Sequence, residues 1–145
     1  MTEPGEWTLA SARAALPEVR KRLAAARAHL DAMREAEEQL QDLRIVHGEQ
    51  VLAVASPGYR EFKGYWDRYH AERGELEQCL LGLQQMGVEV KDVGQGLVDF
   101  RGMLGTAPAY LCWRDDEPDL AWWHPLDEGF AGRRRLPENP ADPVH

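Results

Sequence analysis

The stretch that decides the fold is residues 110–133, YLCWRDDEPDLAWWHPLDEGFAGR. It contains three of the five tryptophans of the chain and one of its two cysteines. Aromatic and other strand-forming residues occupy 109–114 and 120–124, and the acidic segment 115–119 with its proline separates them. Two such runs joined by a short turn are typical of a β-hairpin. We therefore expect two consecutive antiparallel strands here.

The register of this hairpin decides which side chains share a face of the sheet. The expected cross-strand pairs are Arg114 with Leu120, Cys112 with Trp122, and Tyr110 with His124. One face then carries these six residues, and the other carries Leu111, Trp113, Ala121 and Trp123. The second face is wholly apolar and should pack on helices, whereas the first is mixed and suggests contact with water or a ligand. A shift of one residue would exchange the two faces.

Upstream of the hairpin, apolar residues recur with helical spacing. Thr8 is a suitable N-cap for a short helix over Leu9–Ala15. Because proline suits the first turn of a helix, Pro17 suggests that the chain bends at Leu16 and begins a new helix there. The heptad-like spacing that follows predicts a long helix with the apolar positions Leu16, Val19, Leu23, Ala26, Leu30, Met33 and Leu40.

A second helix is expected from about Tyr59 to Met86, where Gly87 can cap its C-terminus. Its apolar positions are Tyr59, Phe62, Trp66, Tyr69, Leu76, Leu80 and Leu83. Both helices are basic early and acidic late, so antiparallel pairing places opposite charges side by side. The two helices therefore predict an antiparallel hairpin. Residues 45–56 between them are either a frayed helix end or a packed loop that contains the turn.

After the second helix the pattern changes to short strands, expected at Val88–Lys91 and Gly96–Phe100. The fold class is therefore α+β: a long antiparallel, coiled-coil-like helical hairpin packed with a small C-terminal antiparallel β-sheet. The expected parts are a single domain over residues 1–136, with the hairpin at about 16–86, the β-meander at about 88–124 and a capping loop at 125–136, followed by a flexible proline-rich tail at 137–145.

Composition argues against several classes of protein. With 145 residues, of which 43% are hydrophobic and 29% charged, the chain has the balance of a soluble globular protein. Its net charge of -8 argues against nucleic acid and membrane partners. No apolar run approaches the roughly 20 residues of a membrane helix, and the N-terminus lacks a signal-peptide pattern. Cys79 and Cys112 form no CxxC motif, so we expect a cytoplasmic protein.

Several segments carry a resemblance to a known family: Thr8–Leu9 with Ala12, Leu16–Pro17, Gly87–Asp92, Gly96–Phe100, Leu111–Arg114, Glu117–Pro118, Trp123–His124 and Gly129–Arg133. In this order they resemble a bacterial and archaeal family, the domain-of-unknown-function family 2203. The resemblance covers most of the chain and is weakest between Ile45 and Tyr59. No settled activity belongs to the family, so the resemblance implies an architecture rather than a reaction.

The first candidate site is a divalent metal site near the end of the hairpin, formed by Glu117, His124, Asp127 and Glu128. Histidine and carboxylates are suitable ligands, and Cys112 lies nearby in the expected register. The spacing His-x-x-Asp-Glu matches no strong metal signature. In the alternative interpretation the histidine packs beside a tryptophan, and the acids are solvated turn residues.

The second candidate is a small-molecule site whose ligand-binding residues are Cys112, Arg114, Trp122, His124 and Arg133. The two arginines could grip a carboxylate or phosphate, and His124 could move a proton. The glycines in Gly129–Gly132 permit a loop that closes over the sheet. In the alternative interpretation the tryptophans are core residues, and Arg133 pairs with Glu117 or Asp127 to pin the loop.

The helical hairpin offers a different function, as a non-catalytic module for oligomerisation or protein interaction. Tyr65, Cys79 and Leu81 lie off the expected apolar stripes and would remain exposed in a monomer. A second protomer could cover them in a homodimer, or the sheet and the first helix could do so. The chain has no P-loop, GxGxxG, HExxH or GxSxG motif, and no reaction type follows from its residues.

Overall fold

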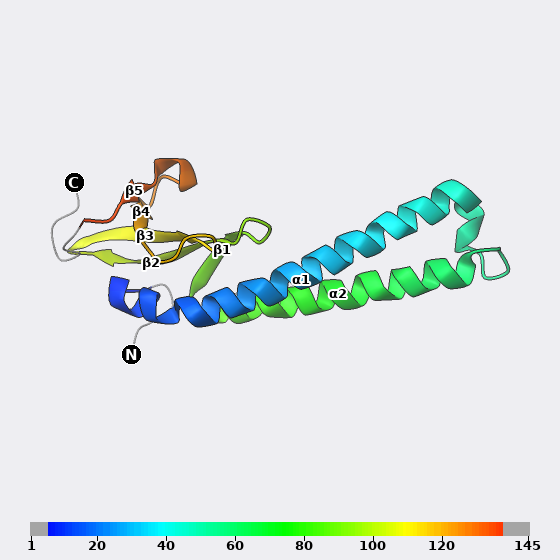
Figure 1. Cartoon of the computed structure of the whole chain (residues 1–145), viewed down its shortest axis with the longest axis horizontal. Coiled ribbons are helices and arrows are strands. Elements are labelled where there is room, and N and C mark those ends of the chain that lie inside the picture. Colours follow the sequence, from blue (N-terminus) through cyan, green and yellow to red (C-terminus); the bar gives the residue numbers. More distant parts are fainter. Residues whose placement is uncertain (1–5, 138–145) are drawn as a thin grey trace. The chain divides into compact units, whose positions relative to one another are not determined.

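The computed structural model describes residues 6–137, so all but the first residue of the expected tail lies outside the described residues (Figure 1). The elements, in chain order, are α1 (Leu9–His47), the 3-10 helix η1 (Glu49–Leu52), α2 (Tyr59–Gln85), β1 (Val88–Asp92), β2 (Leu97–Leu104), β3 (Ala107–Arg114), β4 (Trp122–His124), the 3-10 helix η2 (Phe130–Gly132) and β5 (Arg134–Arg135). The predicted α+β class is confirmed. None of the described helices is long and apolar enough to cross a membrane.

The chain divides into two compact units. The first combines residues 1–24 with 79–145, and its described part contains the sheet, the start of α1 and the end of α2. The second unit, residues 25–78, contains the remainder of the two helices together with η1. Each unit has its own cluster of buried apolar side chains.

Helix α1 is continuous through Pro17, so the expectation of a separate helix over Leu9–Ala15 and a new helix from Leu16 is wrong. A proline inside a helix removes one backbone hydrogen bond and costs roughly 3 kcal/mol. Packing offsets this cost, because buried residues before and after the exposed proline belong to the same core: Leu9, Ala12, Leu16, Val19 and Leu23. Tertiary contacts therefore outweigh the local preference of proline.

The strands form one antiparallel meander in the order β1-β2-β3-β4-β5. The predicted register between β3 and β4 is confirmed, because Tyr110 pairs with His124 and Cys112 pairs with Trp122. The side chains of the sheet therefore divide between an inner face, which packs on the helices, and an outer face. The expected assignment of residues to these two faces holds throughout β3 and β4.

Two details of the sheet differ from expectation. β4 begins only at Trp122, so Leu120 precedes the strand and is not paired with Arg114. Leu120 is instead fully buried in the core with the inner face. A fifth strand, Arg134–Arg135, lies inside the expected capping loop and pairs with β4.

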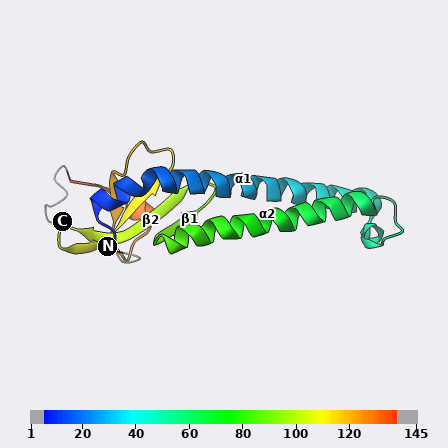
Figure 2. The same ribbon diagram turned by 90° about the horizontal axis from the view of Figure 1, so that it is seen from below.

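The inner face forms the core of the first unit. Leu111, Trp113 and Trp123 are buried there with Leu23 of α1 and Leu83 of α2. Figures 1 and 2 show the first turns of α1 running along this face of the sheet. The prediction that the apolar face packs on helices is confirmed.

Trp7 ties the N-terminal segment to β2. Its backbone nitrogen donates to the carbonyl oxygen of Arg101 at 2.9 Å, and its carbonyl oxygen accepts from the nitrogen of Met103 at 3.2 Å. Its indole nitrogen donates to the carbonyl oxygen of Gly87 at 3.0 Å. The two backbones approach so closely that a Cβ atom at Gly102 would lie 1.8 Å from the Trp7 carbonyl oxygen. Glycine is therefore required at position 102.

In the second unit the helices are antiparallel, as their charge pattern predicts (Figure 2). His29 Nδ1 lies 2.6 Å from a carboxylate oxygen of Glu72, and Arg68 lies 4.0 Å from Glu35. Partly exposed pairs of this kind contribute at most about 1 kcal/mol each. These ion pairs therefore select the antiparallel orientation of the helices but add little to the stability of the helix pair.

The connection between the helices is both a helix end and a packed loop. α1 continues to His47, and η1 then places Val51 in a buried cluster with Leu43 and Phe62. Tyr65 packs on this cluster, although it was expected to lie off the apolar stripe.

Trp66 was expected on the stripe and is 46% exposed. The buried face of α2 is therefore displaced by one residue at this point. The reason is that η1 contributes Val51 to the cluster, in addition to the residues from α1 and α2.

Gly102→Ala is expected to lower the free energy of unfolding by about 2–4 kcal/mol. The reason is that the added methyl group would displace the backbone of Trp7. Urea denaturation followed by tryptophan fluorescence measures the change. Gly64→Ala in α2 is the matched control, because a methyl group there meets no atom within 4 Å and should stabilise the helix slightly. Equal effects of the two substitutions would contradict the close approach of Trp7 to β2.

Candidate functional site

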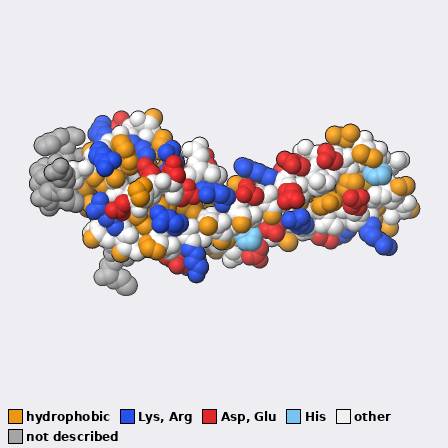
Figure 3. Space-filling model, viewed as in Figure 1, with side chains coloured by type: hydrophobic (Ala, Val, Ile, Leu, Met, Phe, Trp, Pro, Cys, Tyr) orange, Lys and Arg blue, Asp and Glu red, His pale blue; other side chains and the backbone are white. Residues whose placement is uncertain are grey.

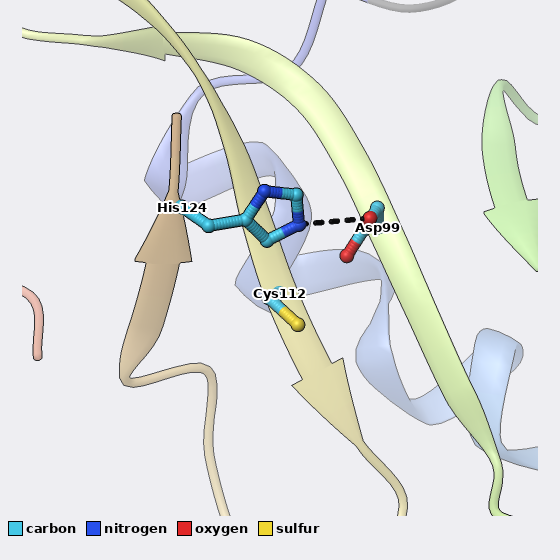
Figure 4. Close-up of side chains that lie close together, drawn as sticks. All are labelled: Asp99, Cys112 and His124. Carbon is cyan, nitrogen blue, oxygen red and sulfur yellow. Dashed lines mark hydrogen bonds and ion pairs between the residues drawn. The ribbon is translucent and has the colours of Figure 1, made fainter. Parts of the chain in front are cut away.

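The outer face of the sheet carries three buried side chains that can bind a metal ion: Asp99 of β2, Cys112 of β3 and His124 of β4. One donor atom from each lies within 4.8 Å of the other two. Figure 4 shows the three side chains gathered across the neighbouring strands. The register explains the cluster, because Asp99 lies opposite Cys112, and His124 lies two residues beyond the β4 partner of Cys112. The imidazole therefore reaches Asp99 diagonally across β3.

His124 is held at both ring nitrogens. Nδ1 lies 2.9 Å from the carbonyl oxygen of Pro125, and Nε2 lies 2.9 Å from Oδ2 of Asp99. A carbonyl oxygen only accepts, so Nδ1 must donate to it. The second contact then needs a proton of its own, carried either by Nε2 or by the carboxyl group. The imidazole was expected on a face open to water or a ligand, and it is only 2% exposed.

Asp99 has one oxygen without a partner. Its Oδ2 faces His124, whereas Oδ1 is buried and receives no hydrogen bond from the described part of the chain. Leaving a buried acceptor unsatisfied costs roughly 1–3 kcal/mol, and more when the group is charged. A cation at this point would supply the missing partner.

Cys112 is buried beside these two residues. Burial, and to a smaller extent the negative charge of Asp99, raise the pKa of its thiol to about 12, although Arg133 opposes both effects. The thiol is therefore neutral near pH 7 and a poor nucleophile in this state. A thiolate could form only with a cation that compensates its charge. The environment consequently disfavours nucleophilic attack by this thiol.

Arg133 holds the segment after β4 against the outer face. Its Nη2 donates to Oε1 of Glu117 and, at 3.3 Å, to the carbonyl oxygen of Cys112. Its guanidinium carbon lies 4.7 Å from the ring centroid of Phe130 and 5.0 Å from that of Trp122. In Figure 1 this segment lies on the side of the sheet opposite the first turns of α1. These contacts agree with the interpretation in which Arg133 pins the loop.

A pocket of about 350 Å³ lies beside the cluster, at the low end of the roughly 300–1,000 Å³ typical of small-molecule sites. Asp99 and His124 line it, and Cys112 does not. The other described lining residues are Lys91, Leu97, Tyr110, Leu126, Glu128, Gly129 and Phe130. Two of the three donor residues therefore form part of the wall of this pocket.

The structure separates the residues of the predicted metal site. Among them only His124 belongs to the buried cluster. Glu117 is engaged in the ion pair with the loop arginine. Glu128 pairs with Arg134 at 3.2 Å, and Asp127 is exposed.

The predicted ligand-binding residues also separate. Cys112 and His124 come together in the cluster. Arg114 instead pairs with Asp116 at 2.7 Å. Trp122 is covered by the guanidinium groups of two arginines, at 5.0 and 5.6 Å from its ring centroid. The arginines thus contribute to packing around the site.

Asp99 is the residue that the sequence interpretation omits. Its signal is an acid in the middle of Gly96–Phe100, where the surrounding strand is apolar. Recognising it requires the register of β2 on β3, which places Asp99 opposite Cys112. β2 extends to Leu104 and β3 begins at Ala107, so both strands are longer than expected. The sequence interpretation therefore lacked the connection that sets this register.

Comparison with known proteins identifies one family. The family described as "Uncharacterized conserved protein (DUF2203)" matches residues 6–136, which is most of the chain. No curated protein and no solved structure matches the chain. Asp99, Cys112 and His124 lie in three of the segments that carry the resemblance seen in the sequence. The chain therefore belongs to the DUF2203 family.

Proposed function

We propose that this protein binds a divalent transition-metal ion of the zinc class through Asp99, Cys112 and His124. The observation that carries the proposal is the burial of these three donors within 4.8 Å of one another. Buried thiol, imidazole and carboxylate groups are costly to bring together unless something compensates them. A divalent cation compensates all three at once.

The donor set indicates which metal is suitable. Zinc accepts sulfur, nitrogen and oxygen ligands, whereas Mg²⁺ and Ca²⁺ prefer oxygen alone. Around a tetrahedral zinc ion the ligand atoms lie roughly 3.5 Å apart. The 2.9 Å between His124 Nε2 and Asp99 Oδ2 and the 4.8 Å limit of the cluster bracket this spacing. Small side-chain movements would therefore complete the coordination.

The orientation of His124 also supports metal binding. Donation from Nδ1 to the carbonyl oxygen of Pro125 leaves Nε2 directed toward Asp99. Histidine ligands of metal ions usually donate their other ring nitrogen to a carbonyl or carboxylate group, which fixes the tautomer and the ring. A metal ion at Nε2 would replace the proton that the contact with Asp99 otherwise requires.

The competing explanation is that Asp99 and His124 form a purely structural buried pair. Such a pair gains little net stability, because the desolvation of two charges offsets most of their attraction. It also gives no role to the unsatisfied oxygen of Asp99. The two explanations differ in their dependence on Cys112, which only the metal site needs.

Metal-free wild-type protein is expected to bind one equivalent of Zn²⁺ in isothermal titration calorimetry. Cys112→Ala removes the sulfur donor. Loss of a residue that only supports a metal ligand weakens metal affinity roughly 10–100-fold, so loss of the ligand itself should weaken zinc binding by at least this factor. Cys79→Ala is the matched control, because Cys79 lies in α2 outside the cluster and should leave affinity unchanged. Equal zinc affinity in all three proteins would contradict the proposed ligands.

Zinc affinity is expected to rise with pH between 6 and 8. The raised pKa of Cys112, about 12, means that its thiol is protonated throughout this range. Coordination must therefore release that proton, and each proton released raises the apparent affinity by about tenfold per pH unit. Calorimetry in buffers of different ionisation enthalpy counts the protons. An affinity independent of pH would show that Cys112 does not coordinate as a thiolate.

A second candidate function is self-association through the tip of the helical hairpin. Ile45, Val46 and Val54 are 81%, 74% and 78% exposed. Figure 3 shows hydrophobic side chains gathered at this end of the hairpin. Exposed apolar residues that lie close together often mark interaction surfaces. We infer that a homodimer would form through this tip rather than through Tyr65, which packs within its own chain.

The double variant Val46→Asp/Val54→Asp is expected to convert a dimer to a monomer in native mass spectrometry. Its thermal midpoint should remain nearly unchanged, because both side chains are exposed. Leu81→Asp is the control, since Leu81 is exposed on α2 outside the tip. Loss of the dimer only in the control would place the interface on α2, and a monomeric wild type would exclude self-association.

A further inference from the structure

We infer that the metal ion at Asp99, Cys112 and His124 keeps a coordination position open to the adjoining pocket, and that this pocket takes a small carboxylate. This inference rests on the proposed metal site. Three protein ligands leave the fourth position of a tetrahedral ion for water or substrate. Asp99 and His124 line the pocket, so the open position would face it.

The pocket offers one positive group for an anionic ligand. Among its described lining residues Lys91 is the only lysine or arginine. Its ammonium group lies 5.6 Å from the ring centroid of Tyr110, and the centroid of that ring lies 5.1 Å from the imidazole centroid of His124. Lys91 is therefore next to the cluster, with one aromatic ring between them.

The charges of Lys91 and of the metal site favour a monoanion. Lys91 pairs with Glu89 at 3.0 Å, but the two side chains are 44% and 40% exposed, so water partly screens this pair and a ligand can compete for the ammonium group. A divalent ion bound to one thiolate and one carboxylate is neutral overall. Glu128, the acidic wall residue outside the proposed metal site, pairs with Arg134. One carboxylate would thus be balanced by Lys91 while coordinating the metal.

The hydroxyl of Tyr110 adds a hydrogen-bond donor. Its oxygen lies 3.5 Å from Glu89, which is too long for a strong hydrogen bond. The hydroxyl could therefore turn to a ligand oxygen at low cost. Leu97, Leu126 and Phe130 provide an apolar wall for the remainder of the ligand. The pocket consequently fits a compact molecule with one carboxylate and one apolar or aromatic end.

Benzoate, titrated into the Co²⁺-loaded full chain, tests the inference. Benzoate carries a carboxylate on an apolar ring, and the visible absorption of Co²⁺ reports changes in its coordination. We expect a saturable spectral change with benzoate. Benzamide, which has the same shape without the charge, should bind at least tenfold more weakly. A Co²⁺ spectrum that does not change when benzoate is added, or equal affinities for benzoate and benzamide, would overturn the inference.

Lys91→Ala should weaken benzoate binding at least fivefold and leave Co²⁺ affinity unchanged, and Lys91→Arg should restore much of the loss. Lys63→Ala is the matched control, because Lys63 lies on α2 in the other unit. Unchanged benzoate affinity in Lys91→Ala would overturn the role of the lysine and with it the anion pocket. Failure of the wild type to bind Co²⁺ at all would instead refute the metal site itself, together with this inference. The two failures are thus distinguishable.

Discussion

The antiparallel register of β2, β3 and β4 is the constraint on which both the core and the candidate site depend. Cys112 of β3 lies opposite Asp99 of β2 and opposite Trp122 of β4. The three candidate metal ligands therefore share the outer face of the sheet. The same register directs Trp113 and Trp123 to the inner face, where they pack on α1 and α2. A shift of one residue would bury the polar donors against the helices and expose the indoles. Burial of the indoles therefore also fixes the position of the donors.

The outer face is unusual because it is covered by a loop rather than by a second layer of helices or strands. Arg133 holds this loop through Glu117 and through the rings of Phe130 and Trp122. The cover removes Asp99 and His124 from bulk water but leaves a pocket at their side. Low local dielectric strengthens interactions among the buried groups and also increases the cost of any unpaired one. This combination makes it more costly to bury an acid, a thiol and an imidazole together here than to place them on an open surface.

The local rules that failed did so where contacts distant in sequence were decisive. Pro17 is a helix-breaking signal, yet α1 continues because the same core receives residues on both sides of it. Tyr65 replaces Trp66 on the buried side of α2 because Val51 of η1 joins Leu43 and Phe62 there. Asp99 could not be assigned to the site from the sequence, because Cys112 and His124 lie on two other strands. In each case the outcome depended on which distant segment packs against the residue. The periodicity of a helix or strand does not contain this information.

The sequence by itself determined the α+β class, the antiparallel helices, the register of the hairpin between β3 and β4, and the membership of Cys112 and His124 in the polar face. These follow from alternation, heptad spacing, charge order and turn chemistry, which act over neighbouring residues. Only the tertiary structure decided that His124 is buried, that Asp99 completes the cluster, and that Glu117 pairs with Arg133. The physical reason is that burial and donor geometry depend on which strands and loops meet, and packing of the whole unit settles this.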